Sequence, residues 1–210
     1  MKQPLLIYGA GGLGREILSI VRTSDLWEPV AFIDDVVPAD SVVKGLKVIG
    51  GMRVLEAVDG PRHVVVAIGN PGLKRRLVRD LATYAIRYPA IVHPTAILQD
   101  PESIRIGAGC VVAAGCILTT DIYIGDHVLI NINTTIGHDV SIGAHTSIMC
   151  GVNISGEASI GASVMIGSGS NLLNRVRIGD RSVVGMGAVV IRDVDPDVTV
   201  AGVPAKTIRV

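Results

Sequence analysis

The fold is decided by residues 136–166, which read IGHDVSIGAHTSIMCGVNISGEASIGASVMI and carry an isoleucine at every sixth position. The same spacing continues on both sides, so that an aliphatic residue occupies each sixth position from 106 to 190. Glycine often follows it, and the fourth residue after it is small or branched, as at Cys110, Val128 and Val140. An α-helix does not produce a strict period of six. The spacing therefore indicates a different repetitive structure.

A six-residue repeat is typical of a parallel β-helix, in which each hexad supplies one short strand and a corner, and three hexads complete a coil. We expect five complete coils, at 106–123, 124–141, 142–159, 160–177 and 178–195. The aliphatic side chains should point inward and stack on their equivalents in the next coil. Val92 and Leu98 fit an earlier, incomplete coil, and a two-residue shift between Ile104 and Ile106 predicts a bulge or small loop.

The first ninety residues have a different rhythm, in which strands and helices alternate. Strands are expected at 4–8, 29–33 and 63–68, and helices at 13–23, 52–58 and 73–84. Long crossovers imply a parallel sheet, so this segment resembles half of a Rossmann fold, βαβαβ. We therefore divide the chain into an α/β domain at 1–90, a β-helix at 91–195 and a tail at 196–210. The first domain could cap one end of the solenoid, and residues 193–210 could finish the other.

A glycine-rich loop follows the first expected strand, in IYGAGGLGREI (7–17). Gly9, Gly11, Gly12 and Gly14 satisfy the pattern G-x-G-x-x-G, in which glycines let the backbone approach a diphosphate at a helix N-terminus. A complete dinucleotide fold needs two halves, and here the hexads begin where the second half should be. The loop therefore predicts a site for one nucleotide.

Polar residues also end the other two strands of this domain. Asp34 and Asp35 lie about twenty residues after the glycine loop, where an acid usually accepts from a ribose hydroxyl, although acids at strand ends can also only cap or face solvent. Gly69 and Asn70 follow the third strand. Parallel sheets bind ligands at the carboxyl ends of their strands, so we expect all four residues near the substrate. The basic residues of the following helix are interpreted as a solvated face rather than a phosphate clamp: Lys74, Arg75, Arg76 and Arg79.

The composition excludes several classes of partner. Lys+Arg and Asp+Glu both number 19 and aromatic residues make up 3%, which argues against nucleic-acid binding and a polybasic membrane patch. Membrane insertion is not expected, and the N-terminus does not resemble a signal peptide. Cys110, Cys116 and Cys150 form no CxxC pair, so the sequence predicts no disulfide framework and a cytoplasmic protein. Cys110 and Cys116 should be inert core thiols.

One of the five histidines has a carboxylate beside it. His138 and Asp139 occupy a predicted corner of the β-helix, where an adjacent acid can fix the imidazole tautomer and raise its basicity. This arrangement suits a general base, although a surface histidine in a turn is the simpler alternative. His127 and His145 are separated by one full coil and should lie in one column on another corner.

Taken together, these features resemble the NeuD/PglD sugar acyltransferases of bacteria. The resemblance rests on the glycine loop, the hexads, the motif Ile-Gly-His-Asp at 136–139 and the ending Ala-Gly-Val-Pro-Ala-Lys at 201–206. It implies a left-handed β-helix, a homotrimer with active sites between subunits, and transfer of an acetyl group from acetyl-coenzyme A. The acceptor would be an amino or hydroxyl group of a nucleotide-linked sugar or a sialic acid, for bacterial surface glycans.

The resemblance also assigns roles to individual residues. It makes His138 the base and Asp139 its partner, and places a backbone amide near the thioester carbonyl at Gly156. Coenzyme A contacts are implied at Ser168 and Met186, and at Ser147, where many members have a second histidine. The nucleotide-sugar contacts are implied at Gly11, Gly12, Leu13, Asp34 and Asp35. No metal is required.

Other classes of function fit fewer of these features. A zinc enzyme of the γ-carbonic-anhydrase kind needs three converging imidazoles, and the spacing of His127, His138 and His145 does not favour this. A nicotinamide-dependent oxidoreductase rests on the glycine loop alone, and a β-helix could also be a non-catalytic scaffold. The residues do not distinguish N-acetylation from O-acetylation, nor one nucleotide from another.

Overall fold

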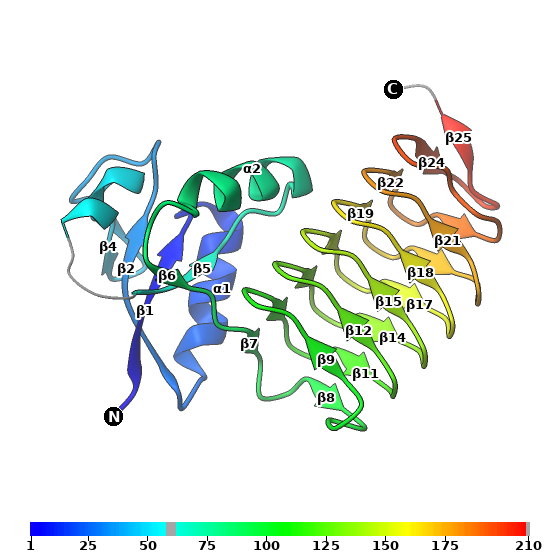
Figure 1. Ribbon diagram of the computed structural model, residues 1–210, viewed down its shortest axis with the longest axis horizontal. Helices are drawn as coiled ribbons and strands as arrows, with labels where there is room; N and C mark the ends of the chain where they lie inside the picture. Colours follow the sequence, from blue (N-terminus) through cyan, green and yellow to red (C-terminus); the bar gives the residue numbers. More distant parts are fainter. Residues whose placement is uncertain (58–61, 209–210) are drawn as a thin grey trace.

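The computed structural model describes residues 1–57 and 62–208 and has two parts, an α/β domain and a long β-helix (Figure 1). The α/β domain holds a four-stranded parallel sheet of order β2-β1-β5-β6. Its elements are β1 (Gln3–Tyr8), α1 (Gly12–Arg22), β2 (Trp27–Ile33), β3 (Val42–Val43), β4 (Leu46–Lys47), the 3₁₀-helix η1 (Met52–Glu56), β5 (Arg62–Val66), α2 (Pro71–Leu81) and β6 (Ile86–Arg87).

The expected strands and helices of this domain are present, with ends shifted by a few residues. The helix expected at 52–58 is a short 3₁₀-helix ending at Glu56, and position 58 lies outside the described residues. The β3–β4 hairpin and the edge strand β6 were not predicted. Each of these strands has two residues, which is too short for an alternating pattern of apolar and polar residues to be recognised.

The β-helix has three parallel faces, as the six-residue repeat predicts. The first face contains β7 (Ile91–Val92), β10 (Val111–Val112), β13 (Leu129–Ile130), β16 (Ser147–Ile148), β19 (Met165–Ile166), β22 (Val183–Val184), β24 (Thr199–Ala201) and β25 (Lys206–Ile208). The second face contains β8 (Ile97–Leu98), β11 (Ile117–Leu118), β14 (Thr135–Ile136), β17 (Asn153–Ile154), β20 (Asn171–Leu172) and β23 (Val189–Val190). The third contains β9 (Arg105–Ile106), β12 (Tyr123–Ile124), β15 (Ser141–Ile142), β18 (Ser159–Ile160) and β21 (Arg177–Ile178).

The interior of the β-helix is formed by the second residue of each two-residue strand. Every predicted inward residue from Val112 to Val190 is buried, while Ile106, in the first coil, is partly buried and packs against the same core. Cys110 and Cys116 are also fully buried, as expected of core thiols. The regular pairing of strands one coil apart, such as Ile124 with Ile142, stacks identical or similar side chains along the axis.

The repeat is irregular at both ends of the β-helix. β7 pairs with β10 at a spacing of 20 residues, because residues 99–104 form a small loop between β8 and β9, as the shift at Ile104 predicts. At the other end β22 pairs with β24 at a spacing of 16 residues, and β25 then runs antiparallel to β24. In the described part of the chain no helix is long and apolar enough to span a membrane.

The α/β domain packs against the side of the β-helix. Ile17 of α1 belongs to one buried cluster with Ile91, Val111 and Leu129, the outward residues of the first three strands of the first face. The expectation that this domain caps an open end is therefore wrong in its placement. The physical reason is that these outward residues are apolar and need cover, whereas the third face presents Arg105 and Tyr123 at the corresponding positions.

Candidate active site

A pocket opens at the carboxyl end of the parallel sheet, where the sequence predicts a nucleotide. We call it the nucleotide pocket, and its volume is about 410 Å³. It lies between the ends of β1 and β2 and the exposed side of α2. The residues that line it are Tyr8, Gly9, Asp34, Asp35, Val36, Met52, Ile68, Leu73, Arg76, Leu77 and Asp80.

The glycine loop beside this pocket has the geometry that the motif requires. Gly9 has a φ of +111°, which L side chains rarely adopt, and a Cβ added at Gly14 would lie 1.9 Å from the carbonyl oxygen of Gly9. The loop therefore needs glycine at both positions to turn from β1 into α1. Gly11 and Gly12 are exposed and a Cβ on either would meet nothing, so their backbone is open to a ligand.

Asp34 and Asp35 both line this pocket, but they differ in exposure and in the hydrogen bonds that their carboxylates already accept. The Asp34 carboxylate accepts from the backbone N–H of Ala10, Val36 and Val37 at 2.8–2.9 Å. Burial alone would raise the pKa of Asp34, but these three donors outweigh it and hold the pKa below its ordinary value. Asp34 thus fixes the two loops that border the pocket.

Asp35 is the more accessible of the two acids. One of its oxygens accepts from the hydroxyl of Tyr8, and the other accepts from Met52 N–H at 2.9 Å. The Tyr8 pKa is raised above its ordinary value, first by burial and then by this hydrogen bond and the charge of Asp35. Because Asp35 is exposed and lines the pocket, it is the better placed acid for a ligand hydroxyl.

Gly69 and Asn70 lie next to the nucleotide pocket rather than in its lining. The Asn70 side chain accepts from Leu73 N–H at 2.9 Å and caps α2, which begins with Pro71. Gly69 faces Leu13, since a Cβ on Gly69 would lie 3.7 Å from a methyl group of Leu13. Gly69, Asn70 and Leu13 thus lie where the chain enters α2 and beside the glycine loop.

The basic residues of α2 do not share one environment, which corrects their interpretation as a solvated face. Arg75 and Arg79 are exposed, and Arg76 is exposed but lines the nucleotide pocket. Lys74 is 2% exposed and its ammonium group donates to the β-helix. Helical periodicity does place residues 73, 76, 77 and 80 on one face, a pattern that could have indicated Arg76.

The predicted base is built at the corner between the second and third faces. His138 and Asp139 follow β14, and Asp139 has a φ of +58° that turns the chain into β15. Nδ1 of His138 lies 2.8 Å from a carboxylate oxygen of Asp139. With the proton on Nδ1, Nε2 keeps its lone pair and can accept a proton from a substrate. His138 is exposed, so a substrate can reach it.

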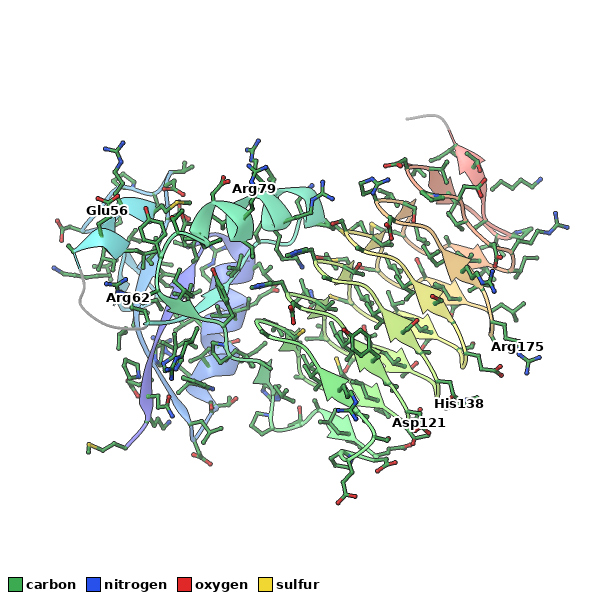
Figure 2. The ribbon with its side chains drawn as sticks, in the orientation of Figure 1. Glu56, Arg62, Arg79, Asp121, His138 and Arg175 are labelled. Carbon is green, nitrogen blue, oxygen red and sulfur yellow. The ribbon has the colours of Figure 1, made fainter. Side chains whose placement is uncertain are left out.

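Gly156 occupies the same corner one coil further along. A Cβ added there would lie 2.5 Å from Nε2 of His138, so the imidazole ring rests directly over the Gly156 backbone. The next residue, Glu157, holds Arg175 through two hydrogen bonds of 2.9 Å. In Figure 2, Asp121, His138 and Arg175 follow one edge of the β-helix, away from the α/β domain.

Ser168 and Met186 lie on a different corner, between the first and second faces. They occupy equivalent positions of successive coils, and Met186 is largely exposed. Within one chain, His138 and these two residues therefore lie at opposite edges of the second face. Within one chain, a ligand that borders all three residues would have to cross the second face.

Ser147 does not fit the coenzyme A contact expected of it. It is an outward residue of the first face, fully buried under α2, and its hydroxyl oxygen accepts from Nζ of Lys74 at 2.9 Å. Its side chain is thus part of the contact between the two domains. The position of Ser147 in the repeat could not indicate that it is buried, because the residue that contacts it belongs to a helix more than seventy residues away in the sequence.

His127 and His145 do not form a metal site with His138. They stack at the corner between the third and first faces, with ring centroids 5.4 Å apart and planes inclined by 6°. Among the described residues no group of three histidines, cysteines or acids is arranged to hold a metal ion. Within one chain, His127 and His145 therefore lie on a different corner from His138.

Comparison with protein families matches each part of the chain. Residues 4–81 match the family described as the PglD N-terminal domain. Within the β-helix, residues 97–120 match the hexapeptide repeat of succinyl-transferase, and residues 157–192 match the bacterial transferase hexapeptide family. No curated protein sequence matches the chain significantly.

Solved structures resemble the chain over nearly its whole length. PerB from Caulobacter crescentus is 30% identical, with a TM-score of 0.91, over 99% of this chain and 98% of PerB. The acetyltransferase domain of PglB from Neisseria gonorrhoeae is 31% identical, with a TM-score of 0.83, over 98% and 99% of the two chains. WeeI from Acinetobacter baumannii is 28% identical, with a TM-score of 0.88, over 98% and 100%.

Proposed function

The chain belongs to the NeuD/PglD-like family of hexapeptide-repeat sugar acyltransferases, and from this premise we propose that it transfers an acetyl group from acetyl-coenzyme A to an amino group of a nucleotide-linked sugar. The observation that carries the proposal is the pair His138–Asp139, in which the His138 side chain is exposed, Nδ1 is bound to Asp139 and Nε2 lies beside Gly156. Transfer to a hydroxyl group is the alternative within the same chemistry.

The relatives support the choice of both substrates. PerB was crystallised with CoA and GDP-perosamine, and the acetyltransferase domain of PglB with acetyl coenzyme A. A perosamine N-acetyltransferase from Caulobacter crescentus is 29% identical to this chain, which favours an amine as the acceptor group. The nucleotide pocket supports the nucleotide part of the proposal, because Arg76 offers a cation for a diphosphate and Asp35 an acceptor for a ribose hydroxyl.

In the proposed reaction the acceptor amine attacks the thioester carbonyl while Nε2 of His138 accepts its proton. Asp139 keeps the ring oriented through Nδ1 and stabilises the imidazolium that forms. As the tetrahedral intermediate collapses, the C–S bond breaks, and the imidazolium returns the proton to the sulfur. The products are an acetamido sugar and free coenzyme A, so atoms and charges balance without a metal or a covalent enzyme intermediate.

The oxyanion of the intermediate needs a hydrogen-bond donor, for which we propose the N–H of Gly156. In the described part of the chain this N–H donates to no backbone acceptor, and the His138 ring lies where a Cβ of the same residue would be. A backbone donor fixed in a corner stabilises developing negative charge without reorganisation. Acetyl-coenzyme A would extend from this point toward Ser168 and Met186 of an adjacent subunit.

We also propose a homotrimer in which each active site lies between two subunits. The separation of His138 from Ser168 and Met186 by the width of the second face supports it. The position of His138 supports it as well, because His138 lies on the edge of the β-helix away from the α/β domain, which holds the nucleotide pocket (Figure 2). A cytoplasmic location and a role in bacterial surface glycans complete the proposal. The unpaired thiols of Cys110, Cys116 and Cys150 are compatible with a reducing compartment.

The experiment is a panel of nucleotide-linked amino and hydroxy sugars incubated with acetyl-coenzyme A, following the free thiol and the mass of the sugar product. We expect thiol release with at least one amino sugar, and a His138→Ala variant should lose about 10²- to 10⁴-fold in kcat. Light scattering and circular dichroism must show the same assembly and fold in both proteins. A variant that turns over normally would remove His138 from the role of base.

A further inference from the structure

Lys74 is an unusual residue for its position. Its side chain is 2% exposed, and its ammonium group donates to the Ser147 hydroxyl at 2.9 Å and to the Thr146 carbonyl oxygen at 3.2 Å. None of the ion pairs among the described residues includes it. Burial lowers its pKa to about 7, opposed only by nearby Cys110. A buried amine without an acid partner costs stability.

The contact that Lys74 makes joins the helix that lines the nucleotide pocket to the β-helix of the same chain. Its helix, α2, lines the nucleotide pocket through Leu73, Arg76 and Leu77. Its acceptors belong to β16 and the corner before it, in the coil that follows His138. Among the described residues, every hydrogen bond from α2 to the β-helix is donated by Lys74.

Resting on the proposed function, we propose that Lys74 is a positioning residue, which holds the nucleotide pocket in a fixed register on the β-helix so that the acceptor reaches the acyl-transfer site. Apolar contacts between α1 and the first face tolerate small shifts, whereas an amine between two oxygen acceptors specifies one position along α2. The reaction depends on such register, because a displacement of about 1 Å can reduce turnover by roughly 10²-fold.

Two substitutions test this role by having opposite expected effects on stability. Lys74→Met keeps an unbranched side chain one atom shorter and removes the buried amine, so the melting temperature at pH 7 should be unchanged or higher. Ser147→Ala leaves the amine with one acceptor fewer, so the melting temperature should fall. In both variants we expect kcat/KM for the nucleotide sugar to fall about tenfold.

Binding measurements separate positioning from a change in the pocket itself. Because Lys74 lies outside the pocket lining, Kd for the free nucleoside diphosphate and for coenzyme A, measured by calorimetry, should stay within about twofold of the wild type. Arg75→Met is the matched control, since Arg75 is exposed on the same helix, and it should leave kcat/KM unchanged. Amide exchange over residues 72–81 should be faster in both test variants and not in the control.

Two results would overturn the role of Lys74. One is an unchanged kcat/KM in Lys74→Met, and the other is a loss of nucleotide affinity equal to the loss in kcat/KM. If the wild type transfers no acetyl group to any nucleotide sugar, the proposed function fails, and amide exchange alone decides whether Lys74 fixes α2. Amide exchange over residues 72–81 that is unchanged in both variants would then also contradict the role of Lys74 in fixing α2 on the β-helix.

Discussion

At the scale of single residues, the candidate site depends on the lack of a side chain at Gly156. The His138 ring lies so close to this backbone that any Cβ would press on Nε2, the atom assigned to proton transfer. Gly156 does not need a left-handed backbone, because its φ lies outside that range. Position 156 is therefore a glycine because the His138 ring occupies the space that a side chain would need.

This explanation predicts the effect of Gly156→Ala. The methyl group would displace the His138 ring and lower kcat by about 10²-fold or more, while changing the free energy of unfolding by less than about 1 kcal/mol, since the backbone tolerates alanine. Steady-state kinetics and urea unfolding measure the two effects. Ser155→Ala, an exposed neighbour on the same corner, is the control. Full activity in Gly156→Ala would mean that the ring is free to move.

Sequence reasoning identified these residues with unequal success, for a physical reason. His138 and Asp139 are adjacent in the chain, so their contact is local and could be predicted. Lys74 and Arg76 are two residues apart on one helix, yet one is buried against the β-helix and the other lines the pocket. Which face of α2 packs on the β-helix depends on how the two domains dock. The sequence of α2 alone does not indicate that face.

At the scale of elements, the corner between the third and first faces contains two stacked histidines, of which His127 is buried and His145 is partly buried. His127 is 6% exposed, stacks on His145 and contacts the edge of Tyr88. The pKa of His127 is lowered to about 4, first by burial and then by His145, although Asp126 opposes the shift. The His145 pKa is lowered as well, by burial and by the charges of Lys74 and Arg75.

These shifts predict that the protein loses stability in mild acid. Between about pH 6.5 and pH 4 the unfolded chain takes up a proton at His127 that the folded chain does not, so the free energy of unfolding should fall by roughly 2–3 kcal/mol. Urea unfolding from pH 4 to pH 8 measures it. In His127→Asn the free energy of unfolding should depend less steeply on pH. Asparagine is chosen because it tolerates the positive φ of position 127. An equal slope in the two proteins would exclude His127 as a source.

The regular part of the fold could be predicted at this scale, and its irregular parts only in outline. Each hexad has an aliphatic residue at the inward position and a small or branched residue near the corner. The six-residue spacing of the inward residues therefore predicts every strand from 105 to 190. The spacing of 16 residues at the last coil breaks that rule, because the chain leaves the repeat near Val194, which still bridges to Ile178. A closing hairpin such as β24–β25 then depends on the last coil rather than on its own sequence pattern.

At the scale of the whole molecule, the proposed substrates are held by parts of the chain that do not meet. The nucleotide pocket belongs to the α/β domain on the first face, whereas His138 lies on the edge between the other two faces (Figures 1 and 2). In the proposed homotrimer, the pocket of one subunit therefore serves His138 of its neighbour. A cyclic trimer provides three equivalent sites of this kind.

Mixed trimers test this central claim most directly. One parent is His138→Ala, which keeps the pocket, and the other is Asp35→Ala/Arg76→Glu, which keeps the base; each alone should be nearly inactive. After the two are unfolded together and refolded at equal amounts, about a quarter of the sites should combine an intact pocket with an intact neighbouring His138, and restore about a quarter of wild-type transfer. Refolded mixtures of intact assembly that stay as inactive as the parents would contradict an active site shared between subunits.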